Sequence, residues 1–398
     1  MLLRTRAVDR RAVEAPGSVL NCGHLFLRTP VLMMLFFQEV EMSSKVYFIP
    51  AGSKQASAET LAEKAAKLYA KAGFASQLAP GRLVAIKQHF GEKGGEGFLK
   101  PPVARRFAEL IRKAGAKPFV TDTSTLYRGS RSNAVDHLEL CASHGFTQEK
   151  VGCPVIIADG LVGASQVMVK IDGKHYQRVP IAADAFHAYA LVVLTHVTGH
   201  VAAGLGASIK NVGMGLSSRA GKLDQHHGDV PIVDAGKCTA CGRCAELCPG
   251  DAITVEKIAV INKEKCIGCG ECLATCPAGA VLFHWGETSQ HLNEKMAEHA
   301  LAVKRTHEGR MCYFNFMTHL TQECDCFGIQ QDVPCADVGI AASDDIVAVD
   351  QAAVDIIKKE RGKDLILEFH PEIDYSSQLE YGEAIGLGSR KYELVEIP

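Results

Sequence analysis

Eight of the fifteen cysteines lie within 39 residues, at the spacing of metal ligands. Three follow one another as C-x2-C-x2-C, a fourth comes after three more residues, and a proline follows it directly; this pattern occurs twice. Three such cysteines surround three corners of a 4Fe–4S cube, and the fourth reaches the other cube because the chain has already turned away. The sequence therefore predicts one cluster held by Cys238, Cys241, Cys244 and Cys276, and a second held by Cys266, Cys269, Cys272 and Cys248.

Zinc and free thiols are the alternatives for these cysteines. Zinc ribbons use paired C-x2-C motifs and require neither the third cysteine nor the proline, so two complete copies favour iron–sulfur clusters. Gly242, Gly268 and Gly270 stand between the ligands and permit close approach of backbone amides to the cluster sulfides. Because thiolates must stay reduced to hold iron, we expect a cytoplasmic protein.

The cysteine motifs form an internal repeat, since Lys237–Ile253 matches Lys265–Val281 at a period of 28 residues. This is the duplication of two-cluster ferredoxins. Strand and helix patterns alternate on both sides of the repeat, which favours an α/β fold with a mainly parallel sheet and an inserted ferredoxin-like (α+β) module. The predicted division is a leader over 1–41, a first α/β part over 42–228, the ferredoxin module over 229–286 and a second α/β part over 287–398.

The leader has four arginines before residue 12 and a short apolar run, Val31–Phe37. A cleavage site of small residues does not follow that run, and Met42 begins a segment typical of a domain start. We expect residues 1–41 to be an upstream extension that is disordered or not part of the native protein, with a targeting signal as the alternative.

Hydrophobic periodicity predicts the elements of the α/β part. A hairpin of Val167–Ile171 with His175–Val179 is expected around Asp172-Gly173, a strong turn signal. Strands are predicted at Lys45–Pro50, Leu83–Phe90, Lys117–Asp122, Val155–Ala158, Ala190–His196, Met311–Phe316 and near Ile346–Val349, and helices at Ser57–Ala72, Pro101–Ala114, Ser132–His144, Leu292–Val303 and Ala352–Glu360.

Polar side chains gather where these strands end. The carboxyl ends of neighbouring parallel strands form the crevice in which open α/β sheets bind ligands. Polar strand-end loops are also common without any function, so each residue has that second explanation. The predicted catalytic residues are Lys87, His89, Asp122, His196, His200 and Lys210, and the predicted ligand-binding residues are Arg128, Arg131 and Asn211.

The chain resembles the domain of unknown function 362 family, described as uncharacterized Fe–S center proteins. The resemblance covers Ser44 to Pro398 and rests on the ferredoxin repeats and on five other stretches. It implies iron–sulfur binding but no particular reaction, because the family has no general assigned activity. The stretches are residues 85–101, 121–146, 154–161, 194–226 and 380–397.

The stretch His200-x3-Gly204-x-Gly206-x3-Lys210 is similar to the histidine–glycine–lysine segment of the lactate racemase family, whose lysine anchors a nickel-pincer nucleotide. The surrounding sequence differs, so cofactor and reaction are not carried over. The similarity implies at most a related α/β scaffold with a cleft at Lys210.

The other cysteines are expected to be reduced structural thiols. Cys324 and Cys326 are separated by one residue, and side chains at that spacing usually diverge too far for a disulfide. A third metal site or a redox thiol pair near His319 is the alternative. The same expectation holds for Cys22, Cys141, Cys153, Cys312 and Cys335.

A net charge of −2 without blocks of like charge argues against nucleic acid as a partner, and no apolar stretch is long enough for a membrane helix. We expect electron transfer through the two clusters, with a soluble electron donor or acceptor as partner, to a redox reaction on a small anionic substrate or cofactor in the α/β part. The first hypothesis is therefore that the protein is an oxidoreductase. A non-enzymatic electron carrier or adaptor and a metal- or cofactor-handling protein are the others.

Overall fold

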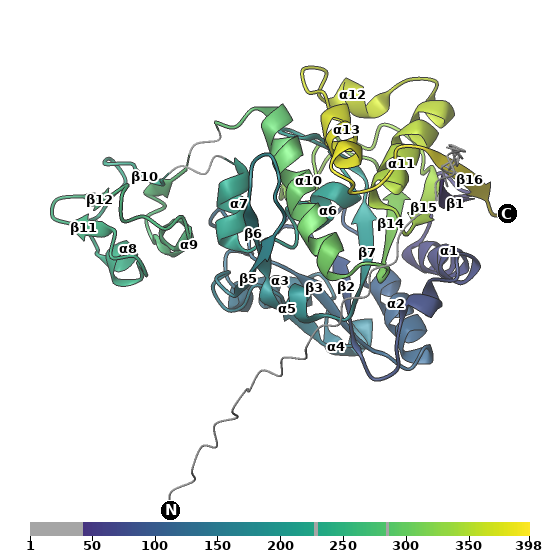
Figure 1. Cartoon of the computed structure of the whole chain (residues 1–398), viewed down its shortest axis with the longest axis horizontal. Coiled ribbons are helices and arrows are strands. Elements are labelled where there is room, and N and C mark those ends of the chain that lie inside the picture. Colours follow the sequence, from purple (N-terminus) through teal and green to yellow (C-terminus); the bar gives the residue numbers. More distant parts are fainter. Residues whose placement is uncertain (1–42, 227–229, 284–285) are drawn as a thin grey trace, which may run out of the picture. The chain divides into compact units, whose positions relative to one another are not determined.

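The computed structural model describes residues 43–226, 230–283 and 286–398, so the predicted leader lies outside the described residues. The predicted α/β fold is confirmed: eight strands form a mainly parallel sheet in the order β16-β1-β15-β14-β7-β2-β3-β4 (Figure 1). Strand β15 runs antiparallel to both of its neighbours, and every other adjacent pair in this sheet is parallel. The chain leaves β2 for β3 and β4 and returns to β7 on the other side of β2, so the strand order reverses between β2 and β7.

Most predicted strands are confirmed to within two residues, but the strand near Ile346–Val349 is wrong. Those residues begin helix α11 (Ile346–Arg361), because the Asp345 carboxylate accepts hydrogen bonds from the first amides of the helix. The sheet comprises β1 (Ser44–Pro50), β2 (Leu83–Gln88), β3 (Lys117–Asp122), β4 (Val155–Ile157), β7 (Ala190–His196), β14 (Met311–Met317), β15 (Gly339–Ser343) and β16 (Tyr392–Glu396).

Helices cover both faces of the sheet, as the alternation of strand side chains requires. Val84 and Ile86 of β2 pack with α1 (Ala58–Lys71), the 3-10 helix η1 (Phe74–Gln77) and α2 (Pro101–Lys113). Ala85 faces the core of α6, α10 and α11. The helices not yet bounded are α3 (Ala134–Ser143), α4 (Gln148–Val151), α5 (Ala183–His187), α6 (Ser208–Gly213), α7 (Arg219–His226), α10 (Ser289–Thr306), α12 (Leu365–Phe369) and α13 (Ser376–Ala384).

Two antiparallel hairpins lie beside the main sheet. The predicted hairpin is β5 (Gln166–Lys170) paired with β6 (Arg178–Ala182). Its second strand begins later than predicted, because the amides of His175 and Tyr176 donate to the Glu298 carboxylate of α10 instead of pairing across the hairpin. The other hairpin, β8 (Thr198–His200) with β9 (Gly204–Gly206), leads from β7 into α6.

Residues 230–283, here called the cysteine-rich segment, repeat their backbone conformation at the 28-residue period of the sequence. Three pairs of equivalent positions have a positive φ, which is unusual for the alanine and the aspartate among them. Its elements are β10 (Ile232–Val233), α8 (Arg243–Glu246), β11 (Ile253–Val255), β12 (Ala259–Ile261), α9 (Glu271–Thr275) and β13 (Val281–Leu282). The pairs are Ala240 (φ 53°) with Gly268 (68°), Gly242 (78°) with Gly270 (69°), and Asp251 (46°) with Gly279 (60°).

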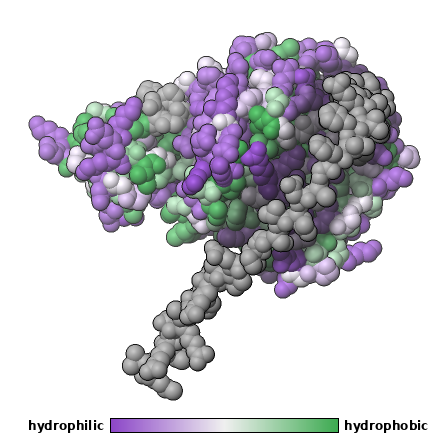
Figure 2. All heavy atoms as spheres, in the orientation of Figure 1, coloured by the Kyte–Doolittle hydropathy of each residue, from purple (hydrophilic) through white to green (hydrophobic). Residues whose placement is uncertain are grey.

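Among the described residues, no helix combines the length and the apolar character that a membrane span requires. Hydrophilic and hydrophobic residues are interspersed over the face seen in Figure 2, without one hydrophobic area covering it.

Helix α6, which carries Lys210 and Asn211, packs closely on α10 through Gly213. A Cβ atom at Gly213 would lie 2.1 Å from the Met296 carbonyl oxygen. We expect Gly213→Ala to separate the two helices and to lower the free energy of unfolding by about 1–3 kcal/mol in chemical denaturation. Gly129→Ala is the control, because its nearest neighbouring atom is 4.0 Å away. Equal stability of the two variants would contradict this packing.

Candidate functional site

A cavity of about 590 Å³ lies at the carboxyl ends of β2, β3 and β7, bordered by α6 and by the loop between β14 and β15. We call it the strand-end cavity. All six predicted catalytic residues line it, together with Arg131 and Asn211. Arg128 does not: it is exposed, and its guanidinium donates to the Pro277 carbonyl in the cysteine-rich segment. The structure thus brings together Lys87, His89, Asp122, Arg131, His196, His200, Lys210 and Asn211.

Lys87 is completely buried at the floor of this cavity. Its Nζ lies 2.9 Å from Asp122 Oδ1 and donates to Asn211 Oδ1 at 2.7 Å. Burial lowers the pKa of Lys87 although Asp122 opposes the shift. Burial alone would raise the pKa of Asp122, but Lys87 and further cations outweigh it and lower that pKa. The second carboxylate oxygen, Oδ2, is buried without a hydrogen-bond partner among the described residues, and so remains an acceptor for a ligand.

Arg131 organises the next side of the cavity. Its guanidinium donates to Glu92 Oε2 and to the Tyr127 hydroxyl, each at 2.8 Å, and its Nη1 lies 2.8 Å from His89 Nε2. Burial, and after it the charge of Arg131, lowers the pKa of His89 to about 3. His89 is therefore neutral at pH 7 and is suited to hydrogen bonding rather than to carrying a charge.

His196 uses both ring nitrogens within the protein. Nδ1 lies 3.0 Å from the Asp325 carboxylate, and Nε2 lies 2.8 Å from the Thr318 carbonyl oxygen. Burial by itself would lower the pKa of His196, but the Asp325 carboxylate outweighs burial and raises it. A protonated ring that donates to Asp325 and Thr318 fits this geometry, and it holds the β14–β15 loop against the end of β7.

Two further lysines direct ammonium groups at the cavity. Lys210 Nζ lies 3.8 Å from Cys324 Sγ, and Lys222 Nζ donates to Thr123 Oγ1 and to the Ser217 carbonyl, each at 2.6 Å. Neither forms a salt bridge with any carboxylate in the described part of the chain. Burial lowers the pKa of each lysine to about 8, so both carry most of their charge at pH 7. Two ammonium groups that no described carboxylate pairs with make the cavity attractive to an anion.

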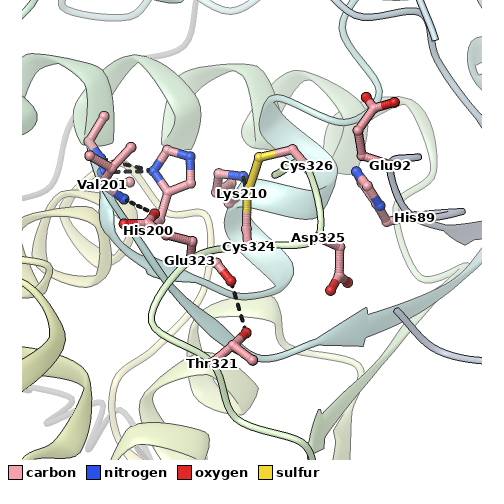
Figure 3. The surroundings of a disulfide bond; sticks show 12 residues. His89, Glu92, His200, Val201, Lys210, Thr321, Glu323, Cys324, Asp325 and Cys326 are labelled. Atoms are coloured by element: carbon pink, nitrogen blue, oxygen red, sulfur yellow. Dashed lines mark hydrogen bonds between the residues drawn. A yellow bond between two sulfur atoms is a disulfide. The ribbon is translucent and has the colours of Figure 1, made fainter. Parts of the chain in front are cut away.

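The prediction of reduced thiols at positions 324 and 326 is wrong, because Cys324 and Cys326 form a disulfide at the cavity wall (Figure 3). A turn closed by the Phe327 amide on the Cys324 carbonyl (3.0 Å) bends the chain there. The Asp325 carboxylate, which lies 3.0 Å from His196 Nδ1, points away from the disulfide. Together, the turn and the contact of Asp325 direct both sulfurs to the same side of the chain. The one-residue spacing of the cysteines does not by itself predict this. Cys141, Cys153, Cys312 and Cys335 are free as predicted, and Cys22 lies outside the described residues.

The eight cysteines of the repeat surround two smaller cavities. One, of about 20 Å³, is lined by Cys238, Cys241, Cys244 and Cys276, and the other, also of about 20 Å³, by Cys248, Cys266, Cys269 and Cys272. Each set combines three cysteines of one half with the fourth cysteine of the other half. Among the described residues, only His200, Cys324 and Cys326 bring three ligand atoms within 4.8 Å of one another, so the thiols of the repeat are spread more widely than around a single ion.

Lys222, Tyr127 and Asp325 also line the strand-end cavity, and none of them was predicted from the sequence. Lys222 follows Gly221 in a pattern that fails as a phosphate-binding loop, and α7 brings it to the cavity. Tyr127 and Asp325 lie in loops, where periodicity carries no information about position.

The domain of unknown function family DUF362 matches residues 84–355. A protein from Thermotoga maritima is similar in structure, at 10% identity and a TM-score of 0.39, over 80% of this chain and 60% of that one. The lactate racemase apoprotein from Thermoanaerobacterium thermosaccharolyticum is similar at 11% identity and a TM-score of 0.35, over 75% of this chain and 53% of that one. This chain therefore spans less than two thirds of either protein, and at these scores neither match bears on what it binds. No curated protein sequence matches it significantly.

The lowered pKa of buried Lys222 can be tested by measuring stability as a function of pH. Its pKa is about 8 in the fold and 10.5 in the unfolded chain, so the unfolded state binds more protons between those values. The wild type should therefore gain stability relative to Lys222→Met as the pH rises from 7 to 10, by at most about 3 kcal/mol in chemical denaturation. Lys113→Met, at an exposed lysine, should follow the wild type. Parallel pH profiles for all three proteins would contradict the burial of this charge.

Proposed function

The chain belongs to the DUF362 family, and we propose that it is an iron–sulfur redox protein. In this proposal the cysteine-rich segment is a two-cluster ferredoxin module that binds two 4Fe–4S clusters. The clusters exchange electrons with a soluble carrier and with a small anionic ligand in the strand-end cavity. The observation that carries the proposal is the division of the eight cysteines between two cavities, each with one ligand from the opposite half.

The arrangement of the thiols supports clusters over zinc. Four thiolates around one zinc ion, at Zn–S distances of about 2.3 Å, stand roughly 3.8 Å apart. No three thiols of the described repeat lie within 4.8 Å of one another, whereas a cubane separates its thiolate ligands further. Backbone amides also point at the sulfurs, since Ala252 N lies 3.3 Å from Cys248 Sγ and Ala280 N lies 3.2 Å from Cys276 Sγ. Such bonds stabilise thiolates and tune a bound cluster.

The two cysteine sites differ in exposure, and both contact the α/β part, since the Arg128 guanidinium donates to the Pro277 carbonyl at the first site. In the first site Cys241 is exposed, which suits exchange with a soluble carrier. The second site adjoins the α/β part, where buried Arg219 pairs with Glu271 at 3.3 Å.

The charges of the strand-end cavity support an anionic ligand. Among the described residues, no carboxylate pairs with the ammonium groups of Lys210 and Lys222, and Asp122 Oδ2 has no partner there, so it can accept from a hydroxyl or a protonated group of the same ligand. A volume of about 590 Å³ is ordinary for a small-molecule site. The pKa of Lys210, about 8, also suits proton transfer near neutral pH. An electron carrier needs no such cavity, which favours an oxidoreductase.

The crossed ligation predicts the effect of a single substitution. Cys276→Ser should remove the cluster shared with Cys238, Cys241 and Cys244, and leave the other intact. In anaerobically purified full-length protein, iron and sulfide should fall from about eight to about four per chain. Cys335→Ser, at a free cysteine outside the repeat, should retain about eight. Tightly bound zinc in place of iron would overturn the cluster proposal.

Anion binding is tested with inorganic phosphate. At about 10 mM it should raise the Tm of the wild type by about 2 °C or more, because a ligand that binds only the folded state stabilises it. Lys210→Met should lose most of that shift, while Lys113→Met should keep it. The same shift in all three proteins would show that phosphate acts elsewhere than in the strand-end cavity.

A further inference from the structure

The disulfide between Cys324 and Cys326 lies in the wall of the strand-end cavity, among groups that can act on sulfur. Cys324 is 7% exposed, and both cysteines line the cavity. The loop that carries them is fixed by neighbours: Gln331 exchanges two hydrogen bonds with the backbone of Glu323, and Asp325 is bound to His196. The sulfurs are therefore presented to the cavity by a firmly held loop.

The ammonium group of Lys210 lies beside the disulfide. Its Nζ lies 3.8 Å from Cys324 Sγ, and no carboxylate of the described residues pairs with it (Figure 3). An ammonium group beside sulfur favours the thiolate over the thiol. The chain therefore holds a positive charge where reduction of the disulfide would create a negative one.

His200 also lies close to the disulfide. Its Nδ1 accepts hydrogen bonds from the amides of Ala202 (3.1 Å) and Ala203 (3.0 Å), so in a neutral ring the proton is on Nε2. Burial, and after it the charge of Lys210, holds the pKa of His200 well below its usual value, which keeps the ring neutral. One ring nitrogen of His200 and both sulfurs lie within 4.8 Å of one another. The neutral His200 ring is therefore close to the sulfurs on which a thiolate would form.

The same three side chains could in principle hold a metal ion once the disulfide is reduced. Two observations disfavour that use. A metal-bound imidazole normally donates its other N–H to an acceptor, whereas His200 Nδ1 faces two backbone donors. The ammonium group of Lys210, 3.8 Å from Cys324 Sγ, would also repel a divalent cation. The surroundings suit thiol chemistry better.

One short segment connects the disulfide with the cysteine-rich segment. Leu126 belongs to the hydrophobic cluster that contains Cys272 and Cys276, and its side chain lies beside Gly270. The next residue, Tyr127, donates from its hydroxyl to the Cys326 carbonyl at 3.3 Å. The second cysteine site and the disulfide are thus in contact with consecutive residues of one loop.

We propose that Cys324–Cys326 is a redox-active disulfide that takes up two electrons, one from each of two reduced 4Fe–4S clusters, and presents a dithiol to the strand-end cavity. The S–S bond breaks, two electrons enter, and one proton is taken from solvent. Cys326 becomes a thiol, and Cys324 stays a thiolate beside Lys210. The inference rests on the proposed function for its electron source, and it adds a two-electron step next to the ligand site.

The test is a reductive titration of the anaerobically purified full-length protein with dithionite, followed by alkylation with N-ethylmaleimide and mass spectrometry. The wild type should accept about four electrons per chain, two in the clusters and two in the disulfide. Cys324 and Cys326 should be alkylated only after reduction. The double variant Cys324→Ser/Cys326→Ser should accept about two electrons, and the control Cys335→Ser about four.

A second variant tests whether Lys210 stabilises the Cys324 thiolate, with Cys335 in the same protein as the control for folding. In the reduced protein at pH 7, Lys210→Met should slow alkylation of Cys324 by about tenfold, because less of it is thiolate, while alkylation of Cys335 is unchanged. Equal rates at Cys324 would contradict the role of Lys210.

The outcomes separate this inference from the proposed function. Absence of iron and sulfide contradicts the proposed function and removes the electron source. If dithionite reduces both clusters while Cys324 and Cys326 stay unalkylated, only the inference is contradicted. Free thiols in the protein as isolated, or a metal ion lost in the double variant, would also overturn it.

Discussion

The buried charge of Lys87 is the constraint on which the site depends. A lysine without solvent contact in a central strand must be paired, and its partners Asp122 and Asn211 come from β3 and α6. Asn211 also donates to the Leu194 carbonyl and the Thr195 hydroxyl at the end of β7. One ammonium group thus ties two strands and a helix together, and that fixes where Lys210, on the same helix, directs its own charge.

The backbone conformation of the cysteine-rich segment depends on its internal repeat and not on a large hydrophobic core. Positive φ values recur at equivalent positions of the two halves, which lets each loop wrap three cysteines around a small cavity. The connection to the α/β part is local: buried Arg219 pairs with Glu271, and Arg128 donates to the Pro277 carbonyl. Arg128, predicted as a ligand-binding residue, thus contacts the cysteine-rich segment instead of the cavity.

Much of the fold could be predicted from the sequence because strand and helix periods are local signals. The run Ala190–His196 reads as a buried strand and is one. The pattern of Ile346–Val349 also predicts a strand, but these residues form a helix because the Asp345 carboxylate caps its first turn. The convergence of Lys87, Asp122 and His196 followed from the geometry of parallel strands. The disulfide and Lys222 could not be foreseen, because a turn in one loop and the docking of α7 depend on distant contacts such as His196 with Asp325.

In the proposed function, the two four-cysteine cavities hold 4Fe–4S clusters that are close enough to interact magnetically. Electron paramagnetic resonance of the anaerobically purified full-length protein, after dithionite reduction, tests it most directly. We expect the signals of two reduced 4Fe–4S clusters, broadened by their mutual magnetic interaction. A protein that shows no such signal and contains zinc at these cysteines would contradict it.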